Sequence, residues 1–280
     1  MPESKSETAE ATTRESSETE TPLTKKIPLV EAFGPTVQGE GHVIGQLTYF
    51  LRFGLCDFKC KMCDSMHAVD RDEVRATAKW LTQDEIFDEA MRLRKPRTTP
   101  WFTFSGGNPA IHDLYHLTHL LHRHDFKIAV ETQGSYWNYW LTKADVVTVS
   151  PKGPGMGERC ELDTLDGFMG MLAGYPGVNM KVVIFDQRDI EFASMLYERY
   201  IIQDINIKPH KYYFNSNHFY LSLGNPYPPP KKLPEYVDLR NELIERYKVL
   251  LDDVQHHPLL SRTKFLPQMH VWLYGNARGV

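Results

Sequence analysis

The arrangement of three cysteines near residue 60 constrains this 280-residue chain more than any other feature of its sequence. Cys56, Cys60 and Cys63 are spaced C-x3-C-x2-C, whereas the remaining cysteine, Cys160, stands far from them. Thiolates this close in one loop repel one another unless they share a soft metal centre or are oxidised. The spacing therefore predicts a metal-binding loop, and the rest of the fold has to present it.

Two kinds of metal centre fit a loop with three thiolates. Structural zinc takes four protein ligands in a closed tetrahedron, whereas a four-iron cluster held by three thiolates leaves one iron open to a substrate-like ligand. His67 is the residue that could complete a Cys3His zinc site. The run Leu47–Phe53 predicts a buried strand before the loop, and barrel enzymes carry their chemistry at such strand ends. This context favours the cluster, with zinc as the alternative.

The composition predicts a soluble domain that acts on a small substrate. A hydrophobic content of 41% in 280 residues is enough for one core. The formal net charge is −4 and no basic run exceeds Lys25-Lys26, so nucleic acid and anionic membranes are not expected partners. The sequence has no apolar stretch of membrane-spanning length and no signal peptide at its start. Together with the cysteine usage, these features predict a cytoplasmic, reducing location.

The chain divides into a tail and a catalytic domain. Residues 1–26 are rich in Glu, Thr and Ser and contain no aromatic residue, which predicts a disordered acidic tail. Residues 27–280 are predicted to form one catalytic domain. Within it, residues 209–234 are rich in Tyr, Asn and Pro, and we expect an irregular insertion there.

Strands and helices alternate along the catalytic domain. A capping box formed by Thr82 and Glu85 predicts a helix that lasts to about Arg94. Strands are expected at 27–33, 47–53, 101–104, 127–130, 146–149 and 180–185, and further helices at 189–200 and 233–251. The alternation predicts an α/β fold, an incomplete (βα) barrel whose strand ends gather at one mouth.

A histidine-rich helix is predicted after the strand at 101–104. Its apolar stripe consists of Leu114, Leu117 and Leu121, and the histidines at 112, 116 and 119 are expected on the opposite, solvated side. The sequence has no His-Glu-x-x-His pattern, so these histidines are not expected to bind metal.

Several of these motifs together resemble a known family. C-x3-C-x2-C is the signature of the radical S-adenosylmethionine (SAM) enzymes. The segment Phe33–Gly41, Arg52 at a strand end and Cys63-Asp64-Ser65 resemble one branch, the 7-carboxy-7-deazaguanine synthases. The resemblance runs from about residue 27 to the C-terminus and implies the incomplete barrel of the radical SAM type.

The resemblance also implies roles for individual residues. Those implied to bind substrate are Val37, Gln38, Gly39, Glu40, Arg52, Ser105, Glu131, Gln268 and His270. Those implied to bind SAM are Met62, Cys63, Asp64, Gly106, Gly107, Asn108, Ser150, Pro151 and Lys152. The implied catalytic ligands of a 4Fe-4S cluster are Cys56, Cys60 and Cys63, and Ser65 is the implied Mg2+ ligand.

Two of these positions depart from the superfamily. Met62 stands where an aromatic residue is usual, and Asn108 stands where the superfamily has a glutamate. Because charge-assisted hydrogen bonds are the stronger ones, the neutral amide of Asn108 predicts weaker binding of the SAM ammonium group.

The activity implied by the resemblance is a ring contraction. It converts 6-carboxy-5,6,7,8-tetrahydropterin to 7-carboxy-7-deazaguanine with release of ammonia, in queuosine-type 7-deazapurine biosynthesis. A homodimer and an electron donor such as flavodoxin or ferredoxin are implied partners. The alternatives are another radical SAM enzyme, such as a glycyl-radical activase, and a zinc-stabilised binding module. The activase does not account for Gln38-Gly-Glu-Gly41 or Arg52.

Replacement of one cysteine separates these alternatives. In Cys56→Ala we expect loss of both the cluster and turnover, because two thiolates cannot replace three at the irons. Iron, sulfide and zinc are measured in anaerobically purified wild-type and variant protein. Retained activity in the variant, or colourless wild-type protein containing zinc, contradicts the cluster prediction.

Overall fold

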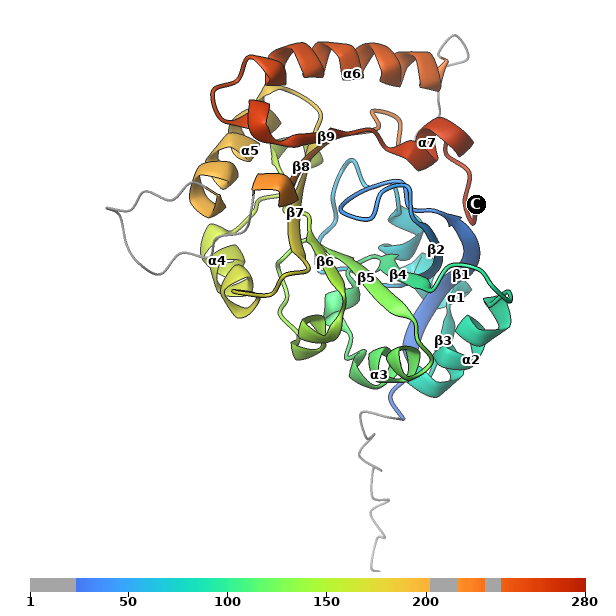
Figure 1. The fold of residues 1–280 in the computed structure, drawn as a ribbon. Helices are drawn as coiled ribbons and strands as arrows, with labels where there is room; N and C mark the ends of the chain where they lie inside the picture. The colour runs from blue at the N-terminus through green and yellow to red at the C-terminus, as the bar shows by residue number, and fades with distance from the viewer. Residues whose placement is uncertain (1–23, 202–215, 230–237) are drawn as a thin grey trace, which may run out of the picture.

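The computed structural model describes residues 24–201, 216–229 and 238–280 (Figure 1). In these residues, nine strands form one sheet in the order β3-β1-β2-β4-β5-β6-β7-β8-β9. The strands are β1 (Ile27–Val37), β2 (Leu47–Phe53), β3 (Lys79–Leu81), β4 (Trp101–Gly106), β5 (Lys127–Thr132), β6 (Val146–Val149), β7 (Val178–Ile184), β8 (Phe219–Leu223) and β9 (Lys264–Leu266). The sheet has two edges, β3 and β9, so it is open, and the predicted α/β class is confirmed.

The direction of the strands decides where the site lies. β1 runs antiparallel to β2 and β3, and every neighbouring pair from β2 to β9 is parallel. Parallel neighbours need crossover connections, which here are mostly helical. The carboxyl ends of β2 and of β4 to β8 therefore point in the same direction. The motifs that follow these strands meet at that end of the sheet.

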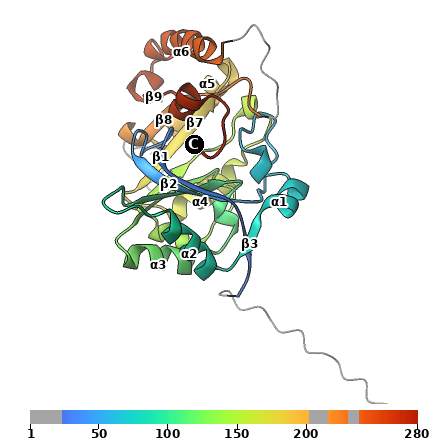
Figure 2. The ribbon, with the colours of Figure 1, turned by 90° about the vertical axis from the view of Figure 1, so that its right-hand side faces the viewer.

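The helices lie outside the arc of strands, as Figures 1 and 2 show for α2 to α6. They are α1 (Arg71–Thr77), α2 (Gln83–Leu93), α3 (Tyr115–Arg123), α4 (Leu162–Met171), α5 (Gln187–Tyr200), α6 (Leu239–Gln255) and α7 (Met269–Tyr274). The capping box predicted at Thr82 and Glu85 is present and begins α2. None of the helices in the described segments is long and apolar enough to cross a membrane.

The core is continuous from β1 to α6 and is rich in aromatic residues around the first parallel strands. Phe53 of β2 packs edge to face on Phe104 of β4, with ring centroids 5.4 Å apart, and Trp140 lies against Phe104. β6 and β8 are buried along their whole length. Strands covered on both faces need not alternate between polar and apolar residues.

β8 corrects the prediction of an irregular insertion at 209–234. Within that range, Phe219–Leu223 is a fully buried strand paired in parallel with β7 and β9. The surrounding Tyr, Asn and Pro residues indicate turns, and a strand of five buried residues shows no alternation that could reveal it. Residues 209–215 and 230–234 lie outside the described segments, as does most of the predicted tail.

The position of His112 also differs from the prediction that it lies on the solvated face of a helix. The predicted stripe of Leu114, Leu117 and Leu121 is fully buried, but His112 lies before α3 and is partly buried rather than on a solvated helix face. Its Nε2 is 2.8 Å from the carbonyl oxygen of Gly54, and burial lowers the pKa of its imidazole. His112 therefore supports the backbone that leads into the cysteine loop.

The burial of β8 generates a stability prediction. In Leu221→Ala we expect the free energy of unfolding to fall by about 2–5 kcal/mol, because Leu221 is fully buried and its loss leaves a cavity. Leu251→Ala in α6 is the matched control: Leu251 is 42% exposed, so about 0.5 kcal/mol is expected. Urea denaturation measures both, and equal effects contradict the position of β8 in the core.

Candidate active site

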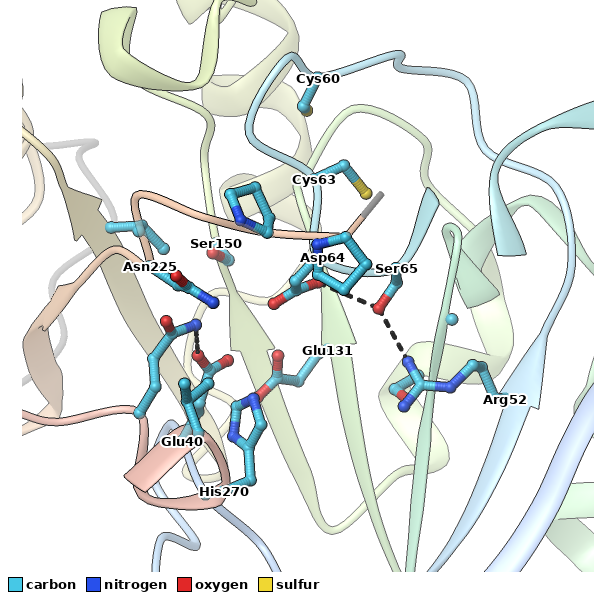
Figure 3. Close-up of a pocket in the computed structure, with 18 of the residues that line it drawn as sticks. Glu40, Arg52, Cys60, Cys63, Asp64, Ser65, Glu131, Ser150, Asn225 and His270 are labelled. Carbon is cyan, nitrogen blue, oxygen red and sulfur yellow. Dashed lines mark hydrogen bonds between the residues drawn. The ribbon is translucent and has the colours of Figure 1, made fainter. Parts of the chain in front are cut away.

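A cavity opens at the carboxyl ends of the parallel strands (Figure 3). Its wall comes from the end of β1 and the glycine loop after it, the cysteine loop after β2, and the ends of β4 to β8. The segment around α7 closes the remaining side, where the amide of Met269 donates to the carbonyl oxygen of Gly39. Segments from both termini of the described domain therefore meet in one pocket.

Nearly all residues predicted from the sequence line this cavity. All predicted substrate residues do so: Val37, Gln38, Gly39, Glu40, Arg52, Ser105, Glu131, Gln268 and His270. So do the residues predicted for cluster and metal, Cys56, Cys60, Cys63 and Ser65, and for SAM, Met62, Cys63, Asp64, Gly106, Gly107, Ser150 and Lys152. Asn108 and Pro151 are not in the lining.

Gly106 and Gly107 allow two strand ends to approach closely. A Cβ at Gly106, whose φ is +126°, would lie 2.0 Å from the carbonyl oxygen of Phe53. A Cβ at Gly107 would lie 1.9 Å from that of Leu55. Both distances are impossible for a side chain, so these glycines are required for packing whether or not a ligand is bound. Because glycine has no side chain, the backbone atoms at both positions are accessible from the cavity.

The three cysteines line the cavity, where their surroundings disfavour the thiolate form. Burial raises the pKa of each thiol, to about 11 for Cys60 and about 12 for Cys63, and the positive charge of Lys152 only partly opposes this effect. The thiolate is the form that binds metal. A bound metal centre would supply positive charge that favours the thiolates at neutral pH.

The arrangement of ligand atoms does not match a preformed zinc site. A zinc–sulfur distance of about 2.3 Å places the ligands of a tetrahedral site about 3.8 Å apart. Among the described residues, the cysteines and His67 form no group of three ligand atoms within 4.8 Å. His67 instead lies 3.6 Å from the carboxylate of Glu31. A Cys3His zinc site is therefore not preformed here.

A buried lysine, which the sequence analysis missed, organises the opposite wall. Lys181 of β7 is 3% exposed, and its Nζ donates to Glu40 Oε2 at 2.5 Å and to Glu131 Oε2 at 3.0 Å. Gln268 Nε2 donates to the other oxygen of Glu40 at 2.5 Å. The sequence signal that could have revealed this group is the lone lysine in the otherwise apolar run Met180-Lys-Val-Val-Ile184 of β7.

Charge neutralisation keeps these groups ionised. Burial would raise the pKa of Glu40, but the charges of Lys181 and His270 and the hydrogen bonds from Lys181 and Gln268 outweigh it and lower that pKa to about 2. Burial would likewise lower the pKa of Lys181, but Glu131 and Glu40 raise it above its ordinary value. The cavity therefore presents carboxylate acceptors at neutral pH.

Arg52 lies between the sulfur side and the carboxylate side of the cavity. β1 and β2 pair Glu31 with Arg52, whose Nε donates to Glu31 Oε2 at 2.7 Å. Its Nη1 donates to Ser65 Oγ at 2.9 Å, and that hydroxyl donates to Asp64 Oδ1 at 3.0 Å (Figure 3). Burial would raise the pKa of Glu31, but hydrogen bonds and charges from His67 and Arg52 lower it to about 2. Arg52 is thus oriented by Glu31 with its guanidinium toward the cavity.

Several polar groups in the cavity are available to a ligand. Glu40, Asp64 and His270 place one ligand atom each within 4.8 Å of one another, a group able to hold a cation. Ser105 Oγ and Gln268 Oε1 are buried without a hydrogen-bond partner. Because an unpaired buried polar atom costs about 1–3 kcal/mol, these atoms favour a polar ligand that pairs with them.

Asn225 is a further cavity residue that the sequence analysis missed. It follows β8, and its Nδ2 donates to Asn276 Oδ1 at 2.8 Å, while Asn276 Nδ2 donates to the carbonyl oxygen of Tyr227 at 2.9 Å. These bonds hold the segment after α7 against the loop after β8. Asn225 lies in the range predicted as an irregular insertion, so no strand end was expected to present it.

Removal of the buried ammonium generates a pH-dependent prediction. In Lys181→Met we expect the free energy of unfolding at pH 7 to fall by about 3–5 kcal/mol, because two carboxylates lose their cation. Without Lys181 the pKa of Glu40 rises, so acidification neutralises the unpaired charge. In the wild-type protein, the stabilisation that comes from the lowered pKa of Glu40 is complete above pH 4.5 and is lost as the pH falls from 4.5 toward 2. Urea denaturation at pH 7 and pH 5 should therefore show a smaller deficit of the variant at pH 5. An equal deficit contradicts the charge argument.

Comparison with known proteins agrees with this site. No family model matches the sequence. The 7-carboxy-7-deazaguanine synthase of Bacillus cereus is 35% identical over 259 residues, which cover 91% of this chain and 99% of that protein. The synthase of Bacillus subtilis is 35% identical over 262 residues, covering 92% of this chain and 100% of that protein.

A solved structure supports the fold. The crystal structure of QueE from Escherichia coli matches with a TM-score of 0.54 and 22% identity, covering 88% of this chain and 95% of that one. Together with relatives of more than 30% identity along almost their whole length, this match confirms the resemblance expected from the sequence. The chain belongs to the 7-carboxy-7-deazaguanine synthase family of radical SAM enzymes.

Proposed function

We propose that this chain converts 6-carboxy-5,6,7,8-tetrahydropterin to 7-carboxy-7-deazaguanine with release of ammonia. The observation that carries the proposal is that one cavity has a wall of three cysteines and a facing wall of carboxylates, amides and an arginine. The first suits a 4Fe-4S cluster and SAM, and the second suits a flat, polar, carboxylated heterocycle. A glycyl-radical activase would need no such second wall.

The sulfur side of the cavity fits the cofactors. Cys56, Cys60 and Cys63 would hold the cluster, since their buried thiols require a metal to become thiolates. The bare backbone at Gly106 and Gly107 and the side chains of Met62, Asp64, Ser150 and Lys152 would hold SAM. When bound, the cluster and SAM supply the radical that starts the ring contraction.

The carboxylate side fits the substrate. Glu40 and Glu131 offer acceptor oxygens for the N–H groups of an aminopyrimidinone edge, and Lys181 holds both carboxylates in place. Gln268 Oε1 and Ser105 Oγ add unpaired polar atoms at the same cavity. Arg52, held by Glu31, would pair with the substrate carboxylate through its guanidinium.

Apolar side chains around the cavity would limit access of water and of stray hydrogen donors. Phe33 and Phe50 stack with ring centroids 5.0 Å apart, and both line the cavity together with Phe58 and Phe185. Exclusion of solvent matters for radical chemistry because a reactive intermediate otherwise takes hydrogen from the wrong donor.

A magnesium ion and two partners complete the proposal. Ser65 Oγ and the neighbouring carboxylate of Asp64 are oxygen ligands of the kind Mg2+ prefers, and Asp64 also belongs to the group formed with Glu40 and His270. The electron would come from a flavodoxin or ferredoxin. A homodimer stays a prediction from the family resemblance.

Turnover by reconstituted protein tests the proposal directly. Anaerobic protein with cluster is mixed with SAM, a reductant, Mg2+ and the carboxypterin, and the deazaguanine product and ammonia are quantified. In Arg52→Lys we expect the Michaelis constant for the pterin to rise about tenfold or more, because a lysine cannot make the two-pronged bond to a carboxylate.

Arg92→Lys, at an exposed ion pair of α2, is the matched control and should leave turnover unchanged. Absence of product from cluster-loaded wild-type protein overturns the proposed activity. An unchanged Michaelis constant in Arg52→Lys overturns the role of Arg52 alone.

A further inference from the structure

Asp57, which stands between the first two cluster cysteines, is held by three neutral donors from other parts of the chain. Its Oδ1 accepts from Asn108 Nδ2 at 2.9 Å and from Gln133 Nε2 at 2.6 Å. Its Oδ2 accepts from Ser135 Oγ at 2.5 Å. Asn108 follows β4, and Gln133 and Ser135 follow β5. One carboxylate thus ties the cysteine loop to two strand ends.

The amide of Gln133 also reaches a cluster ligand. Its Nε2 is 3.5 Å from Cys56 Sγ, and the backbone amide of Phe58 donates to the same sulfur at 3.4 Å. Gln133 is 6% exposed, so the bond to Asp57 decides which way its amide points. Hydrogen bonds to ligand sulfurs are one of the factors that set the reduction potential of an iron–sulfur cluster.

The same network accounts for the asparagine at position 108. Asn108 is fully buried, and its Oδ1 accepts from Thr132 Oγ1 at 2.8 Å and from the amide of Ala110 at 3.2 Å, while its Nδ2 donates to Asp57. The side chain is therefore an acceptor and a donor at once. A carboxylate at this position could accept both bonds but could not donate to Asp57, and it would place two carboxylates in contact.

We infer that Asp57 is a positioning residue for the cluster: it fixes the cysteine loop on β4 and β5 and holds the Gln133 amide against Cys56. The inference rests on the proposed function, since it requires that Cys56 binds the cluster. The role needs an acceptor toward the amides of Asn108 and Gln133, and a leucine at position 57 offers none.

Two nearly isosteric variants test the inference. Asp57→Leu removes the acceptor oxygens and leaves the buried amide donors of Asn108 and Gln133 without this partner, and we expect iron to be released to a chelator about tenfold faster. Gln133→Met removes the N–H donor from Cys56 Sγ while it keeps the volume, and we expect a lower reduction potential and an altered electron paramagnetic resonance spectrum of the reduced cluster. Asp72→Leu, at an exposed pair with Arg75, is the control for replacement of a carboxylate by an apolar side chain.

The outcomes separate this inference from the proposed function. If wild-type protein binds no cluster after anaerobic reconstitution, both are overturned. If wild-type protein binds a cluster and the two variants match it in iron release, potential and spectrum, only the role of Asp57 and Gln133 is overturned. A purely structural role predicts faster iron release without a change of potential in Gln133→Met, and that result also contradicts the inference. Circular dichroism of each variant confirms that it is folded.

Discussion

The carboxylate side of the cavity depends on the ion pairs of one buried group, the ammonium group of Lys181. It lies in β7 and joins Glu40 of the glycine loop to Glu131 of β5, and through Glu40 it reaches Gln268 before α7. A buried charge of this kind is tolerated only with close counter-charges, so the three segments have to converge. The same contact that holds the wall together leaves the carboxylates ionised and facing the cavity.

The sulfur side of the cavity, formed by the cysteine loop, is held in place by a different kind of interaction. Burial holds the pKa values of the three thiols above the usual range, to about 12 at Cys63. The loop is instead held in shape by neutral hydrogen bonds, chiefly those that Asp57 accepts from Asn108, Gln133 and Ser135. This arrangement leaves charge compensation to the metal centre and keeps its ligands close to the strand ends. Arg52 lies between the two sides, oriented by Glu31 and in contact with Ser65.

Much of the site could be predicted because it consists of short motifs placed at strand ends. The cysteine loop, Ser105-Gly106-Gly107 and Ser150-Pro151-Lys152 are continuous in sequence, and each follows an apolar run that reads as a strand. The predictions were weaker where a signal depends on contacts. β8 is too short and too uniformly buried to show a period, and His112 looks like a member of a solvated face until its bond to Gly54 is seen.

The sequence by itself indicated a metal-binding cysteine loop, the α/β alternation and the resemblance to a family, because spacing, periodicity and short motifs are local properties of the chain. Only the tertiary structure decided which groups pair. Lys181 meets Glu40 across 141 positions of sequence, and Asn108, predicted from the resemblance to contact SAM, pairs with Asp57. Such pairings depend on strand order and register, and no local pattern encodes the distance between residues on different strands.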